Sequence, residues 1–129
     1  MKQTRTTPLF LKRKTVNQKR LWKVCIPDPF DNCEKIYPIQ QKKVQQMISN
    51  LKDDTNVEKI IVFGSSVQDT CHTGSDVDFY IVLKQDRKII FKETLSFIYD
   101  IWTNYTVDSR MYEEIKKKGV TVYERNIAG

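Results

Sequence analysis

Cysteine and histidine are scarce in this chain of 129 residues, which has three cysteines and one histidine. Cys25, Cys33 and Cys71 form no Cys-x-x-Cys pair, and an odd number of cysteines is typical of reduced thiols rather than of a disulfide framework. Cys71 and His72 are neighbours, but two adjacent ligands without a second pair make a poor zinc site. We therefore expect neither a disulfide framework nor a zinc centre.

Long apolar runs are also missing. No run approaches the roughly 20 residues that a membrane-spanning helix needs. The first ten residues lack the continuous apolar segment of a signal peptide. The apolar fraction of 40% and the charged fraction of 29% are those of an ordinary globular protein, and the length is that of one domain. These features predict a cytoplasmic protein that makes no use of a membrane.

Acidic residues are absent from residues 1–24, which hold eight of the 22 Lys and Arg residues. The net charge of +6 is therefore a property of this segment, because the remainder carries fourteen basic and sixteen acidic residues. Such an arm can bind RNA through its phosphates or dock on an acidic partner, and it can equally be a solvated arm. Pro27 and Pro29 mark a connector after it. We expect an arm and connector over residues 1–37 and a globular domain over residues 38–129.

Helices and strands alternate along the predicted domain. Pro38 suits the first turn of a helix, which we expect to run to about Lys52. Four apolar residues at i, i+3, i+4 and i+7 form its buried stripe: Val44, Met47, Ile48 and Leu51. Strands are predicted over residues 57–63, 77–83 and about 97–104, and a second helix over residues 109–118. Residues 22–26 could form a further short strand, and residues 89–95 are too few to assign.

Two aspartates one residue apart, Asp76 and Asp78, lie at the start of the strand predicted over residues 77–83. Alternate side chains of a strand share a face, so these two carboxylates converge on one point. Like charges on one face of a strand repel each other unless a cation lies between them. Hard oxygen ligands at this separation suit magnesium. The structural alternative is a polar strand entrance that faces solvent.

The turn after the first predicted strand begins with Gly64 and Ser65. Glycine has no Cβ, so the backbone can come close to a ligand, and serine adds a hydroxyl and an amide that can donate to phosphate oxygens. The same turn could also be a plain strand exit. Together with the two aspartates, it indicates a site for a nucleoside triphosphate and its magnesium.

An isolated carboxylate, Asp100, lies in a run of otherwise apolar or aromatic residues, 97–102. Burying it would be costly unless it were paired or bound to a metal, so we interpret it as a third ligand. Asp108 competes for this role, but its position directly before the helix predicted over residues 109–118 is explained by N-capping.

At this spacing, Gly64-Ser65 and the segment Gly-Ser-Asp-Val-Asp at 74–78 resemble the nucleotidyltransferases of the DNA polymerase beta superfamily, in particular the minimal nucleotidyltransferase domains. The resemblance continues through Asp100 to the closing segment Gly-Val-Thr-Val-Tyr-Glu at 119–124, and it covers roughly residues 39–124. It implies an α/β fold with a short mixed β-sheet and helices packed on one face. Many relatives carry Arg after Gly-Ser, whereas this chain has Ser66.

The resemblance also implies a reaction, the transfer of a nucleoside monophosphate from ATP to an acceptor hydroxyl with release of pyrophosphate. Asp76 and Asp78 would hold the Mg²⁺ that bridges the triphosphate, and Asp100 would help to hold a second Mg²⁺ that lowers the pKa of the hydroxyl. The residues expected to contact the nucleotide are Gly64, Ser65, Ser66 and Ser75.

The residues themselves do not identify the acceptor, and the expectation for it starts from the resemblance. Some minimal nucleotidyltransferases transfer AMP to a partner protein of the HEPN type in toxin and antitoxin pairs. This sequence ends at Gly129, directly after the predicted core, so we expect a second polypeptide to supply the acceptor. Two alternatives remain: a non-catalytic module that binds nucleotide or RNA, and a transferase that modifies RNA held by the basic arm.

Overall fold

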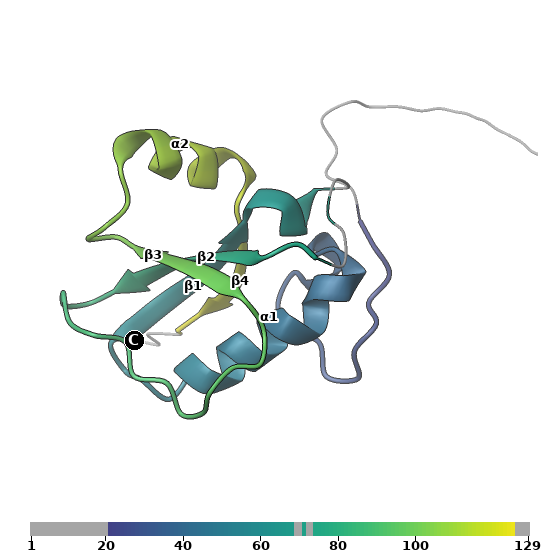
Figure 1. Ribbon diagram of the computed structural model, residues 1–129, viewed down its shortest axis with the longest axis horizontal. Helices are drawn as coiled ribbons and strands as arrows, with labels where there is room; N and C mark the ends of the chain where they lie inside the picture. The colour runs from purple at the N-terminus through teal and green to yellow at the C-terminus, as the bar shows by residue number, and fades with distance from the viewer. Residues whose placement is uncertain (1–20, 69–70, 72–73, 126–129) are drawn as a thin grey trace, which may run out of the picture.

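The computed structural model describes residues 21–68, 71 and 74–125, so most of the expected basic arm and His72 lie outside the described residues. Within them a four-stranded sheet has the order β3-β2-β1-β4 (Figure 1). The central strand β1 (Val57–Phe63) is antiparallel to both β2 (Val77–Leu83) and β4 (Val120–Glu124). β3 (Tyr99–Thr103) is parallel to β2, so the prediction of a mixed sheet is confirmed.

Helix α1 (Pro38–Leu51) covers one face of the sheet. Proline occupies its first turn, where a missing N–H costs no hydrogen bond. Val44, Met47 and Leu51 are completely buried and Ile48 is partly buried, as the apolar spacing predicts. Each fully buried side chain of this kind contributes about 1.5–3 kcal/mol to stability. The opposing strand residues include Ile60, Val62, Val77, Phe79 and Ile81.

Helix α2 (Ser109–Lys118) covers the opposite face, as Figure 1 shows. Asp108 is its N-cap: the Met111 N–H donates to Asp108 Oδ1 at 2.8 Å. Ile115 packs there with Phe63 and Tyr80. The expectation that the helices share one face was therefore wrong. The physical reason is that β1 and β2 carry apolar residues on both faces, and one helix cannot cover both.

Gly119 ends α2 without a left-handed backbone, because its φ of −68° is ordinary. Glycine is required at this position because there is no room for a Cβ atom. A Cβ at this position would lie 2.5 Å from the Ile115 carbonyl oxygen and 2.7 Å from Ile61 Cγ2. Glycine thus allows the chain to pass directly from α2 into β4 while lying against β1.

The connector before α1 is not a strand, but it is attached to the domain. The buried Gln41 side chain accepts a hydrogen bond from the Cys25 N–H at 2.7 Å and donates to the Lys23 carbonyl at 2.9 Å. The rings of Trp22 and Tyr37 meet edge to face at 5.4 Å. Residues 22–37, which the sequence assigns to the arm and connector, therefore contact the core in this structure.

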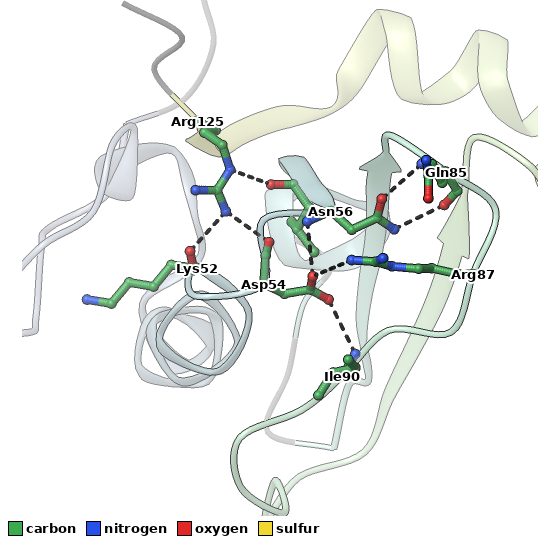
Figure 2. A network of polar contacts seen from close by, with 8 residues as sticks. Lys52, Asp54, Asn56, Gln85, Arg87, Ile90 and Arg125 are labelled. Carbon is green, nitrogen blue, oxygen red and sulfur yellow. Dashed lines mark hydrogen bonds and ion pairs between the residues drawn. The ribbon is translucent and has the colours of Figure 1, made fainter.

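A network of polar contacts joins the end of β4 to the turn between α1 and β1 (Figure 2). Arg125 donates to the carbonyl oxygens of Val57 at 3.0 Å, Lys52 at 3.0 Å and Asp54 at 2.9 Å. Asn56 donates to the Gln85 carbonyl at 3.0 Å and accepts from the Gln85 N–H at 2.9 Å. These bonds anchor the irregular segment after β2, in which residues 89–95 form neither helix nor strand.

Among the described residues, no helix has the length and apolar character needed to cross a membrane.

Candidate active site

The turn after β1 lies directly against Asp78. Gly64 has a φ of +77°, in the left-handed region that glycine adopts at little cost. A Cβ at Gly64 would overlap Asp78 Oδ2. The register explains this contact, because Phe63 at the end of β1 pairs with Asp78 of β2. The two halves of the sequence motif, separated along the chain, therefore meet in the fold.

Asp78 and Asp100 are direct neighbours across β2 and β3. Paired residues of adjacent strands project from the same face of a sheet, here the face that α2 covers. Asp78 is half-buried, whereas Asp76 and Asp100 are exposed. The structure thus makes Asp78 and Asp100 neighbours, and the charges of Asp76 and of Glu114 of α2 act on Asp78.

The electrostatics of this group are unfavourable without a cation. Burial is the largest of several causes that together raise the pKa of Asp78 to about 6; the others are the negative charges of Asp100, Asp76 and Glu114 and a hydrogen bond with Asp100. Each cause favours the protonated form of Asp78. A divalent cation beside these oxygens would reverse the effect, since it favours the carboxylate.

The donor set fits magnesium. In the part of the chain that the structure describes, no three His, Cys, Asp or Glu side chains are gathered into a ready-made metal-binding cluster. Magnesium does not require one, because it commonly takes one or two carboxylates and completes its shell with water and substrate phosphates. Asp78 and Asp100, with Asp76 next to them, supply hard oxygen ligands of this kind.

The serines of the motif differ in their exposure. Ser65 and Ser75 are half-buried, one in the turn η2 (Gly64–Val67) and one directly before Asp76. Ser66 is completely buried, and its hydroxyl accepts a hydrogen bond from Gln40 Nε2 at 3.2 Å. The expectation that the Ser66 side chain faces a nucleotide is therefore corrected: this hydroxyl holds the turn on α1 from inside.

An aromatic layer lies beside the carboxylates, between the sheet and α2. Phe63 and Trp102 meet edge to face at 5.7 Å, and Tyr80 meets Tyr112 at 6.2 Å. Burial raises the pKa of Tyr80. Trp102 follows Asp100 by two residues and so projects from the same face of β3.

A cavity of about 350 Å³ lies elsewhere, on the α1 side of the domain. It is open and is lined by residues of α1 and of the segment after Phe91: Gln46, Ser49, Asn50, Lys92, Glu93, Thr94, Leu95 and Ser96. Asp78 and Asp100 project from the other face of the sheet, which α2 covers. We therefore place the candidate site at the carboxylates and not at this cavity.

Two residues near the site were not predicted from the sequence, Gln40 and Glu114. Gln40 precedes Val44 by four residues and so lies on the buried stripe of α1. A polar residue on an apolar stripe is a signal that could have been noticed. Glu114 carries no such signal, because an acid next to Ile115 is ordinary on an amphipathic helix.

A family model described as "Polymerase beta, Nucleotidyltransferase" matches residues 45–128. The matched segment contains the Gly64 turn, the three aspartates and β4. A search of the curated proteins found no match.

Proposed function

The chain belongs to the polymerase beta nucleotidyltransferase family, and on this premise we propose that it is a magnesium-dependent enzyme that transfers AMP from ATP to a hydroxyl group of a partner protein. One observation carries the proposal: the Gly64 turn touches Asp78, which lies beside Asp100. A turn suited to phosphate and a pair of carboxylates suited to a cation thus lie in contact.

Each group has a defined task in the proposed reaction. Asp76 and Asp78 would hold one magnesium ion, and Asp100 would help to hold a second. The bound magnesium would neutralise phosphate charge and lower the pKa of the attacking hydroxyl. The acceptor oxygen forms a bond to the α-phosphorus, the bond from that phosphorus to the bridging oxygen of the β-phosphate breaks, and pyrophosphate leaves.

The backbone supplies the remaining contacts. Gly64 allows the chain to approach phosphate oxygens closely, and the Ser65 amide and hydroxyl can donate to them. Ser66 is completely buried and would act only by holding the turn on α1, whereas the half-buried Ser75 would lie next to the bound nucleotide.

The acceptor is proposed to be a protein of the HEPN type, as in a toxin and antitoxin pair. Support comes from the resemblance to minimal nucleotidyltransferases and from the position of Asp100. This residue is exposed on β3, a strand at the edge of the described sheet, where a second macromolecule can approach. RNA is the alternative acceptor, because residues 1–24 hold eight basic residues and no acid.

Labelled ATP tests the proposal. The protein is incubated with cell lysate, Mg²⁺ and ATP labelled at the α-phosphate or, in parallel, at the γ-phosphate. We expect a labelled protein band with α-labelled ATP only, because the β- and γ-phosphates leave. Labelled RNA would select the RNA-modifying alternative. Magnesium-dependent nucleotide binding without transfer would select the non-catalytic module, and label from the γ-position would contradict the proposed reaction.

A further inference from the structure

Gln40 connects the two loops of the candidate site from inside the domain. It lies in the first turn of α1 and is completely buried. Its Nε2 donates to Ser66 Oγ at 3.2 Å and to the Ser75 carbonyl oxygen at 3.1 Å. Ser66 belongs to the turn that begins at Gly64, and Ser75 directly precedes Asp76. One amide group thus bridges the phosphate turn and the start of the carboxylate strand.

A second contact strengthens the same connection. The Tyr37 N–H, at the N-cap of α1, donates to the Ser66 carbonyl oxygen at 2.8 Å. The first turn of α1 therefore holds Ser66 by both its side chain and its backbone. The turn cannot move away from α1 without losing two hydrogen bonds.

The choice of glutamine is not explained by stability. Gln40 Oε1 is buried and has no hydrogen-bond partner among the described residues. Such an orphaned acceptor loses its hydration on folding and gains nothing in return. An apolar side chain at this place on the stripe of α1 would avoid that loss. The residue is best explained by what its amide nitrogen holds.

We propose that Gln40 is a positioning residue that fixes the Gly64–Val67 turn relative to the segment that carries Asp76 and Asp78. This inference rests on the proposed function, because it assumes that the turn binds phosphate and the aspartates bind magnesium. Phosphate and cation must meet at one point, and misplacement by about 1 Å can cost roughly 100-fold in rate. Gln40 acts through these groups and does not itself touch the substrate.

Gln41 is a matched control. It has the same side chain, lies in the same turn of α1 and is equally buried. Its Nε2 donates to the carbonyl oxygens of Lys23 and Ile36 at 2.9 and 3.0 Å, and its Oε1 accepts from the Cys25 N–H. All these partners belong to the connector, and none belongs to the two loops of the site.

The experiment compares Gln40→Met with Gln41→Met in the full chain. Methionine keeps the length of the side chain and removes its hydrogen bonds. At a temperature at which both variants are folded, amide hydrogen exchange is measured at residues 64–67 and 75–78, and kcat and KM are measured for AMP transfer. We expect Gln40→Met to lose exchange protection in both loops and to fall roughly 10- to 100-fold in kcat/KM. Gln41→Met should stay within about threefold and lose protection in the connector instead.

Ser66→Ala provides a second variant if Gln40→Met does not fold, because it removes one of the two bridging hydrogen bonds. It should loosen residues 64–67, and its effect should be non-additive with Gln40→Met, since both act on one contact. Equal loop exchange in the Gln40 and Gln41 variants, or unchanged exchange in Ser66→Ala, would overturn the inference. If the wild-type chain transfers no AMP, the proposed function fails, whereas hydrogen exchange still decides whether Gln40 holds the loops together.

Discussion

A partly buried aspartate lies at each end of the sheet, and the two have opposite electrostatic surroundings. At the end shown in Figure 2, Asp54 accepts hydrogen bonds from the Asn56 and Ile90 N–H groups and pairs with Arg87 at 3.7 Å. At the other end, Asp78 faces Asp100, Asp76 and Glu114, all of which carry charge of the same sign. Asp54 is surrounded by hydrogen-bond donors and a positive charge, whereas the charged neighbours of Asp78 are of like sign.

The sign of the charges around an aspartate distinguishes structural residues from candidate functional ones better than its burial does. A charge surrounded by complementary groups in the folded chain contributes to stability. A charge that the fold places among like charges reduces stability, and its presence is explained by a ligand of opposite sign. Substitutions at one end of the sheet at a time test whether Asp54 and Asp78 differ in this way.

The largest expected effect is that of Asp78→Asn. The change removes a proposed magnesium ligand while preserving shape, so AMP transfer should fall by at least roughly 100-fold. The free energy of unfolding should stay the same or rise, because repulsion from Asp100 is relieved. Thermal unfolding and the α-label assay measure the two quantities. Wild-type turnover at saturating Mg²⁺ would show that the metal assignment is wrong.

Gly64→Ala should affect both stability and activity. Alanine is strained at a φ of +77°, and its Cβ would displace Asp78 Oδ2. We expect a loss of about 1–3 kcal/mol in the free energy of unfolding and a roughly 10- to 100-fold fall in transfer. Gly119→Ala is the control, because its Cβ would meet Ile115 and Ile61 instead. It should destabilise the fold with little change in transfer per folded molecule.

Arg125→Met addresses the other end of the sheet. It removes the donors to three carbonyl oxygens, those of Val57, Lys52 and Asp54, and should cost about 2 kcal/mol of stability. Activity per folded molecule should not change, because the network lies away from Asp78. Denaturant unfolding with transfer measured at equal folded fraction checks this expectation. A selective loss of transfer would mean that the two ends are coupled.

The smallest expected effect is that of Asp108→Ala, at about 1 kcal/mol of stability. The Met111 N–H would lose its capping acceptor, and transfer should be unaffected. Asp108→Asn should restore most of the lost stability, because its amide oxygen can accept the same bond. If Asp108→Ala abolishes transfer while Asp100→Ala does not, the third carboxylate must be reassigned to Asp108.

Features that depend on local periodicity could be predicted from the sequence. The bounds of β1, β2 and α2 agree with their predictions, because apolar alternation and a capping aspartate are read within one segment. The positive φ of Gly64 and its contact with Asp78 explain glycine at this turn, whereas the sequence suggested a different reason, close approach to a ligand. The likeness to the polymerase beta family, which the matching model confirms, also rests on short local motifs.

Which faces and which loops meet could not be predicted from local patterns. The burial of Ser66, the bridge made by Gln40 and the placement of α1 and α2 on opposite faces depend on contacts between segments far apart in the chain. Periodicity shows that a segment has an apolar face, but it does not show which surface covers that face. The pairing of Asp78 with Asp100 likewise depends on the register of two strands separated by an irregular segment, which no local pattern specifies.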